Sequence, residues 1–237
     1  MGFFDIFLSE DKRISKEQRR LTNRDLQAED RETAARWLSD NGSGKSLMAL
    51  LSRFEMKLDH QLNDRDEREF IFGILSQHAQ TIERPLRAHL KKAKMIAMPL
   101  RLLEDLFGED IAIEVALELL ERERERDDFK PEKKMDLLVW MAERTHPKAL
   151  ETAVTLLADF DEGVRYSAAE VILNQNDPTG QAPLEALLMD PKEESNRLKV
   201  RLCEAFIKRG WTVADSAGLA PLLPVGFSVA DGRISRA

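Results

Sequence analysis

Apolar residues recur every three or four positions over most of this 237-residue chain. This spacing places them on one face of an α-helix, whereas a half-buried strand would alternate apolar and polar residues. Glycine and proline interrupt the pattern at short intervals, so we expect a series of short helices. The predicted helices cover residues 28–41, 44–55, 65–79, 81–94, 95–107, 110–126, 131–145, 147–159, 161–175, 181–189 and 193–209.

The two ends of the chain differ from this helical region. Residues 1–27 are expected to form an N-terminal amphipathic segment followed by a polar linker or a solvated helix. Its apolar positions are Phe3, Phe4, Phe7 and Leu8. They would either cover the first helical pair or dock on a partner or a membrane surface, although the mixed charge nearby argues against firm membrane binding.

A change of composition after Gly210-Trp211 predicts that the helical region, residues 28–211, ends there. Residues 212–237 are expected to form a small non-helical C-terminal cap over the last helical pair. Within it, Phe227–Val229 and Arg233-Ile234 flank an Asp231-Gly232 turn, which is typical of a β-hairpin.

Part of the sequence repeats. The residues Val164-Arg165-Tyr-Ser-Ala-Ala169 return as Val200-Arg201-Leu-Cys-Glu-Ala205, an offset of 36 residues, and each copy follows an acidic loop. Paired leucines recur as well, at Leu156-Leu157 and Leu187-Leu188. Helical pairs are therefore expected to repeat along the chain.

Residues 146–211 resemble the HEAT repeat family, specifically the bacterial HEAT-like type found in phycobiliprotein (PBS) lyases. Its pattern D-x-x-V-R-x-x-A-A is matched by Asp161, Val164, Arg165, Ala168 and Ala169. The match weakens before residue 130, where the Val-Arg pair is absent. The resemblance implies an all-α, armadillo-like fold, a right-handed α-solenoid of about five or six helical pairs.

The same pattern has a physical reading. A single helical pair cannot bury its apolar face, so neighbouring pairs stack and share a core, and small alanines permit close helix contact. We expect the Asp and Arg of the pattern to join adjacent turns through charge-assisted hydrogen bonds. Their role is then structural.

Charge and cysteine content restrict the classes of function and the compartments that fit this sequence. Asp and Glu outnumber Lys and Arg by 43 to 36, a net charge of −7, which argues against a dedicated nucleic-acid binder. Cys203 is the only cysteine, consistent with a reducing compartment. No apolar run approaches the ~20 residues that span a bilayer. The N-terminus also lacks the features of a signal peptide, so a cytoplasmic location is expected.

The stretch Gly44-Lys45-Ser46 ends like a phosphate-binding loop. However, the residue expected to be the opening glycine is Ser39, and the preceding residues favour a helix rather than a buried strand. We expect a helix–turn–helix instead, in which Asn41-Gly42 ends one helix and Ser43 caps the next.

Few residues suggest catalysis. The four histidines, His60, His78, His89 and His146, occur singly and without metal-ligand spacing, so no metal or cofactor is expected. Enzymes of similar architecture remain the alternative: a module similar to helical-repeat DNA glycosylases, or a bilin lyase.

One basic row stands out in this acidic protein. Four residues, three or four positions apart, would lie opposite an apolar face and form a partner-binding site: Arg84, Arg87, Lys91 and Lys94. A row of opposite charge follows on the helix predicted over residues 110–126: Glu114, Glu118, Glu121 and Glu125. Arg122 and Arg126 are expected to counter part of this charge through contacts between residues four positions apart. The rows form either a bipolar groove or two ordinary solvated faces. The expected function is a non-enzymatic scaffold or adaptor that binds another protein.

Overall fold

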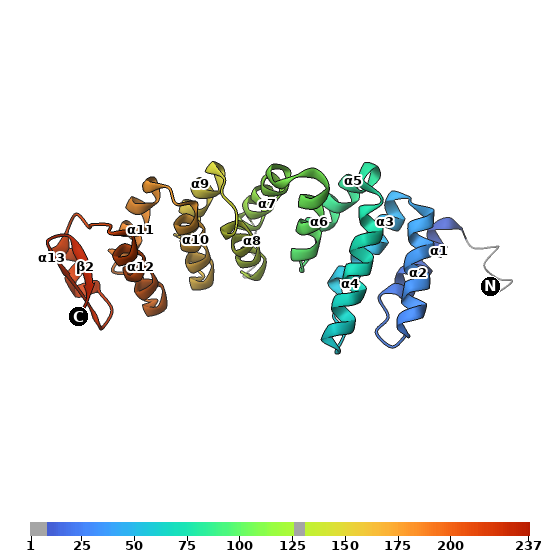
Figure 1. The fold of residues 1–237 in the computed structure, drawn as a ribbon, viewed down its shortest axis with the longest axis horizontal. Helices are drawn as coiled ribbons and strands as arrows, with labels where there is room; N and C mark the ends of the chain where they lie inside the picture. Colours follow the sequence, from blue (N-terminus) through green and yellow to red (C-terminus); the bar gives the residue numbers. More distant parts are fainter. Residues whose placement is uncertain (1–8, 126–130) are drawn as a thin grey trace. The chain divides into compact units, whose positions relative to one another are not determined.

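The computed structural model describes residues 9–125 and 131–237, which are mostly helical (Figure 1). Its contacts divide the chain into two compact units, Met1–Leu119 and Leu120–Ala237, with the boundary inside helix α7. The helical region expected at 28–211 therefore spans both units. Expectations for Phe3, Phe4, Phe7 and Leu8 lie outside the described residues.

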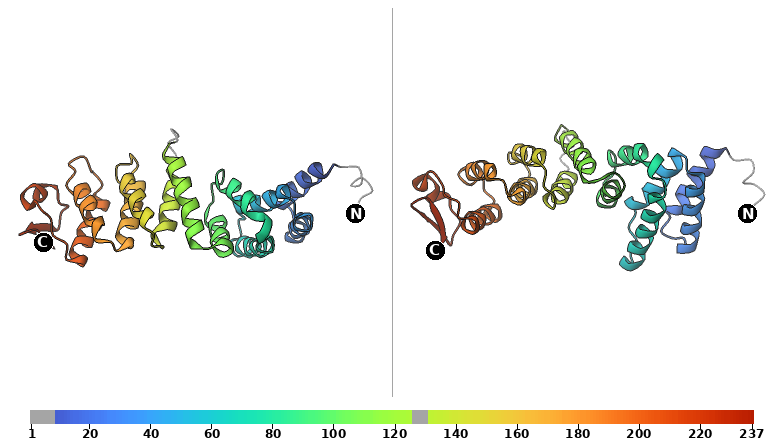
Figure 2. Two further views of the ribbon diagram at one scale, coloured as in Figure 1. Left: turned by 90° about the horizontal axis from the view of Figure 1, so that it is seen from above. Right: turned by 45° about the horizontal axis from the view of Figure 1, so that its top comes forward.

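The first unit contains helices that succeed one another closely along the chain. They are α1 (Glu10–Leu21), α2 (Ala28–Asn41), α3 (Gly44–Leu51), the 3₁₀ turn η2 (Ser52–Glu55), α4 (Gln61–Ser76), α5 (Ala79–Leu90), α6 (Ala97–Phe107) and most of α7 (Glu109–Arg124). Each helix from α1 to α5 contacts the next (Figure 1, Figure 2). Contacts also join every second helix: α1 touches α3, α2 touches α4, α3 touches α5, and α4 touches α6.

The second unit continues this helical pattern and ends in a hairpin. Its elements are α8 (Glu132–Ala142), α9 (Pro147–Leu156), α10 (Glu162–Gln175), η3 (Pro178–Gly180), α11 (Gln181–Leu188), α12 (Asn196–Arg209), α13 (Ser216–Leu219), η4 (Ala220–Leu222), β1 (Phe227–Ala230) and β2 (Arg233–Arg236). Helix α10 packs on α8, α9 and α12, and α11 packs on α12. All eleven predicted helices between residues 28 and 209 are confirmed, with their ends shifted by a few residues.

The polar stretch after residue 8 is a helix with a buried face rather than a linker. Ile14 and Leu21 of α1 are buried, and α1 packs on α2 and α3. Because these two apolar residues stand seven apart in an otherwise charged segment, they form the same helical face. The Arg13 guanidinium lies 4.5 Å from the centre of the Trp37 ring, which adds a cation–π contact to α2.

Capping residues set the ends of several helices. Gly42 ends α2 at a φ of 61°, and Ser43 starts α3 by accepting a hydrogen bond from the Ser46 N–H, as expected. In the second unit, Asp161 caps α10 and Ser195 caps α12. Because Asp161 and Ser195 are the N-caps of α10 and α12, these two helices begin 34 residues apart. This spacing is two residues shorter than the offset of 36 between Val164-Arg165 and Val200-Arg201.

The Asp and Arg of the D-x-x-V-R-x-x-A-A pattern are expected to join adjacent turns. The structure confirms this role for Arg165 only. The Arg165 guanidinium donates to the Glu193 carboxylate, at 2.7 and 3.0 Å, and to the carbonyl oxygens of Asp159 and Phe160. It thus ties the start of α10 to the loop before α12. Asp161 instead accepts a hydrogen bond from the Val164 N–H of its own helix.

The predicted hairpin is confirmed. Strands β1 and β2 are antiparallel, and the pair Ala230↔Arg233 closes on Asp231 and Gly232, whose φ angles are 50° and 77°. Both positive values suit a two-residue hairpin turn. Strand β2 packs on α12, so the hairpin covers the last long helix. Among the described residues, no helix is long and apolar enough to cross a membrane.

Candidate functional site

The three residues that end like a phosphate loop are engaged in structural contacts. The Lys45 ammonium pairs with the Asp11 carboxylate at 2.7 Å. Ser46 is fully buried, and its hydroxyl donates to the side-chain oxygen of Asn41. Since a helix precedes this turn, the strand–loop–helix context of a nucleotide site is absent from this described segment.

Residues capable of acid–base or nucleophilic chemistry are dispersed. The His78 ring is 2.9 Å from the Ser39 hydroxyl, and His89 is buried with its Nε2 3.6 Å from Glu55. Cys203 is buried in α12, and this burial raises the pKa of its thiol to about 12. Within residues 9–125 and 131–237, no group of three or more His, Cys, Asp or Glu is placed to hold a metal ion.

A buried ion cluster in the first unit escaped the sequence reasoning. Arg53 is 0% exposed, and its guanidinium lies 2.9 Å from Asp64 and 3.2 Å from Glu67. Glu67 also accepts two hydrogen bonds from Arg31, and Asp64 pairs with Arg68. No motif signals this cluster, because Arg31, Arg53 and Glu67 come from three separate elements, α2, η2 and α4.

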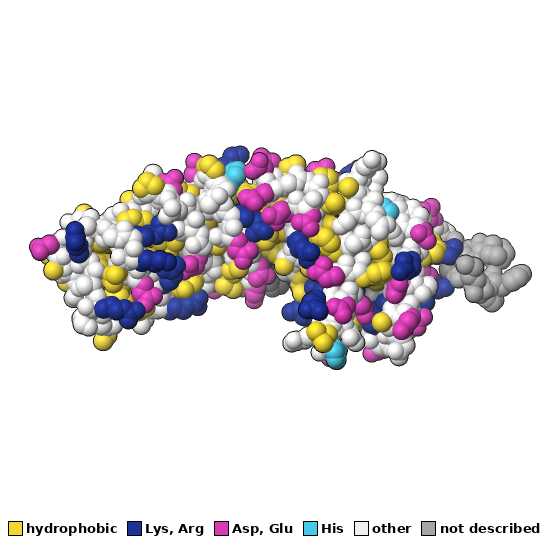
Figure 3. Space-filling model, viewed as in Figure 1, with side chains coloured by type: hydrophobic (Ala, Val, Ile, Leu, Met, Phe, Trp, Pro, Cys, Tyr) yellow, Lys and Arg dark blue, Asp and Glu magenta, His cyan; other side chains and the backbone are white. Residues whose placement is uncertain are grey.

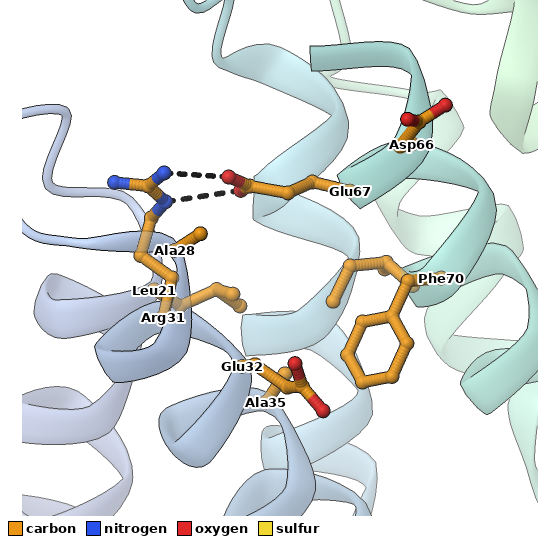
Figure 4. Close-up of a pocket in the computed structure, with 9 residues that line it drawn as sticks. Leu21, Ala28, Arg31, Glu32, Ala35, Asp66, Glu67 and Phe70 are labelled. Carbon is orange, nitrogen blue, oxygen red and sulfur yellow. Dashed lines mark hydrogen bonds and ion pairs between the residues drawn. The ribbon is translucent and has the colours of Figure 1, made fainter. Parts of the chain in front are cut away.

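A pocket of about 220 Å³ opens beside this cluster, between α2 and α4 (Figure 4). The Arg31–Glu67 ion pair lies at one end, and the Phe70 ring lies on the α4 side of the pocket. Leu21 and Ala35, both buried, complete its apolar surface. Arg31 already donates to Glu67 and to the carbonyls of Asn23 and Leu26, so the pocket offers mainly apolar contact.

The predicted basic row is brought together only in part. Arg84 and Arg87 lie on α5, but α5 ends at Leu90, so Lys91 is its cap and Lys94 lies in the following loop. The expected helix over 81–94 is thus wrong at its C-terminal end. The loop turns there because the Glu55 carboxylate accepts hydrogen bonds from the Lys94 and Met95 N–H groups, at 3.0 and 3.4 Å.

This turn adds a residue that the helical spacing had excluded. Lys92 is exposed beside Lys91, and we call Arg84, Arg87, Lys91, Lys92 and Lys94 the cationic patch. Arg87 pairs with Glu83 at 2.9 Å, whereas the side chains of the other four have no ionic partner among the described residues. The face opposite them is apolar as expected. Its residues Ile82, Leu86, Leu90 and Ala93 are buried.

The cationic patch lies in a stretch of the chain that contains no carboxylate side chain. Residues 84–103 contain six Lys and Arg and no Asp or Glu. On the face in Figure 3, basic and acidic side chains are intermixed over the middle of the chain, and further basic side chains gather over the C-terminal elements. An uninterrupted group of cations produces a positive potential that attracts acidic partners.

The predicted acidic row is exposed. Glu114, Glu118 and Glu121 lie on α7, Glu125 follows its last residue, and Glu121 pairs with Arg124 at 2.5 Å. Arg126, expected as a counter-charge, lies outside the described residues. A groove between this row and the basic residues remains a prediction. No protein-family model matches this chain, and no curated protein shows significant sequence similarity to it.

Proposed function

We propose that this protein is a non-enzymatic scaffold or adaptor of the bacterial cytoplasm, built as a HEAT-like, right-handed α-solenoid. The packing inside each unit supports this architecture: α2, α4 and α6 contact in succession, and so do α8, α10 and α12. Stacked helical pairs of this kind present extended surfaces to other proteins.

The cationic patch carries the proposal of a protein partner. Arg84, Lys91, Lys92 and Lys94 are exposed, and no described carboxylate neutralises them. Exposed charges that fold stability does not require are available to steer and orient a partner. We therefore propose that the cationic patch binds an acidic surface of a partner protein. The competing function is a HEAT-like enzyme or nucleic-acid module, similar to a DNA glycosylase or a bilin lyase.

Charge reversal tests this assignment. We choose the variant Arg84→Glu/Lys91→Glu, because neither side chain is paired and its loss should leave the thermal midpoint nearly unchanged. Native lysate is passed over the immobilised full chain, and bound proteins are quantified by mass spectrometry. Recovery of the partner should fall at least about tenfold, equivalent to about 1.4 kcal/mol.

Lys148→Glu/Lys192→Glu is the matched control, since it reverses the same number of charges and both lysines are exposed in the other unit. It should retain the partner. Identical protein sets bound by the wild type and the Arg84→Glu/Lys91→Glu variant would remove the patch assignment. A duplex DNA shifted at low salt by the wild type, but not by the Arg84→Glu/Lys91→Glu variant, would favour the nucleic-acid alternative.

A further inference from the structure

A second recess of about 490 Å³ opens in the first unit, bounded by the loop before α4, the first turns of α4 and the start of α6. Its apolar lining is Leu58, Met95 and Met98, all half-buried, and we call these three residues the methionine groove. The volume falls within the range of about 300–1,000 Å³ that encloses small ligands, so large apolar side chains fit there.

The methionine groove adjoins the cationic patch along the backbone. Met95 follows Lys94 directly, and the Glu55 carboxylate holds both of their N–H groups. Burial disfavours the ionised form of Glu55, but the His89 ring 3.6 Å away and the hydrogen bonds from these two N–H groups outweigh it, so the pKa of Glu55 lies below the usual range. The loop is therefore anchored, with Lys94 of the patch directly beside Met95 of the groove.

The charges that line the groove favour an acidic occupant. Asp64 is neutralised by Arg53 and Arg68, and Glu69 pairs with Arg101 at 2.7 Å. Arg65 pairs with its neighbour Asp66 at 3.4 Å. The exposed lining charges that remain are Lys57 and Asp59, with Lys91, Lys92 and Lys94 in the adjoining patch. Cations thus outnumber the free carboxylates at the rim.

Thioether side chains suit this role, because methionine is unbranched, polarisable and able to repack around different apolar groups. Methionine-lined grooves accept amphipathic helices by enclosing their apolar anchors. We propose that the methionine groove binds the apolar anchor residues of an acidic amphipathic helix in a partner protein, while the cationic patch contacts the acidic side of that helix. This inference rests on the proposed function and specifies the partner segment.

The test uses the full chain with ¹³C-labelled methionine methyl groups and a short synthetic helix of Leu and Glu as the probe. Met95 and Met98 signals are assigned by Met→Leu substitution. We expect both signals to shift and to saturate on titration, while Met189 in the second unit stays unchanged. Affinity should fall as salt is added.

Two probe controls separate apolar from ionic recognition. A peptide with Ala in place of Leu should lose the shifts of Met95 and Met98, and a peptide with Lys in place of Glu should not bind. If the Lys peptide causes equal shifts of the Met95 and Met98 signals, the proposal that the bound helix is acidic is overturned. Absence of any shift at Met95 and Met98 up to about 1 mM Leu/Glu peptide, a limit of about −4 kcal/mol, would overturn the groove.

A variant makes the assignment quantitative. Met98→Gln keeps the length and charge of the side chain but removes its apolar character, so peptide affinity should fall at least about tenfold. Met189→Gln is the matched control and should bind normally. If Met98→Gln binds the peptide as tightly as the wild type, the groove assignment fails. The proposed function is tested separately. It fails if the same proteins are captured from the lysate by the wild type and by the Arg84→Glu/Lys91→Glu variant.

Discussion

At the scale of single residues, the buried charges of the first unit are tightly paired. Arg53 has no exposed surface, and its guanidinium donates to Asp64, Glu67 and the Met56 carbonyl oxygen. Burial opposes ionisation of the Asp64 carboxyl, but hydrogen bonds from Arg53 and the Leu58 N–H, with the charge of Arg68, outweigh it. The pKa of Asp64 therefore lies below its usual value of 3.8.

This shift predicts a pH-dependent loss in Asp64→Asn. The ionised carboxylate stabilises the fold above its unfolded-state pKa, and this contribution disappears as the pH falls through the lower folded-state pKa. At pH 7, the variant should lose about 3 kcal/mol of unfolding free energy, because Arg53 remains buried with one partner fewer. Urea unfolding should show a smaller difference from the wild type below about pH 3.

Asp59→Asn serves as the control, since Asp59 is exposed near the same loop. It should unfold like the wild type at both pH values. A loss in Asp64→Asn that is equally large at neutral and acidic pH would contradict the ionic contribution of this carboxylate.

At the scale of elements, side-chain caps define where helices begin, and this local signal is readable in the sequence. Ser43, Asp161 and Ser195 each accept a hydrogen bond from the N–H three residues later. The capped positions Asp161 and Ser195, rather than the repeated Val-Arg pair, place α10 and α12 in register. The repeated Val-Arg pair differs from this register by two residues, because the cap determines where each helix begins and the pair lies inside the helix.

Removal of a cap should therefore destabilise the second unit. Asp161→Ala should cost about 1 kcal/mol of unfolding free energy. Ser195→Ala should cost at least as much, because its hydroxyl also donates to Glu162 at 2.8 Å. Thermal or urea unfolding measures both effects. Ser9→Ala is the control: Ser9 precedes α1 without a side-chain capping bond, and a comparable loss there would refute the capping argument.

At the scale of the whole molecule, the chain forms two compact units, each with its own buried core. Leu50 and Leu86 are fully buried in the first unit, as are Leu188 and Leu202 in the second. Where each element contacts only near neighbours, stability is approximately a sum of local terms. A defect in one core should then remain local.

Native-state hydrogen exchange tests this locality. Leu50→Ala should lower amide protection in α3 and α5, and Leu202→Ala should lower it in α10 and α12, each by about 2–5 kcal/mol. Protection in the other unit should change far less. A uniform loss across both units from either substitution would show that the chain unfolds as one cooperative body.

Much of the helical fold follows from sequence, but the candidate binding surface follows only in part. Arg84 and Arg87 were found because a helix places residues three apart on one side. Lys92 was missed, because the same rule continued the helix past Leu90. The methionine groove was also missed, since Leu58 and Met98 belong to segments that only folding brings together.

The sequence by itself determined where helices form and where many of them stop, because apolar periodicity, capping residues and left-handed glycines act within a few residues of the chain. Only the tertiary structure decided which charges remain free. The Glu55 carboxylate accepts a hydrogen bond from the Lys94 N–H, 39 positions away in sequence. The Arg53 guanidinium pairs with Asp64 and Glu67, so these two carboxylates are not free surface charges. Such long-range pairings depend on how helices pack, which no local pattern records.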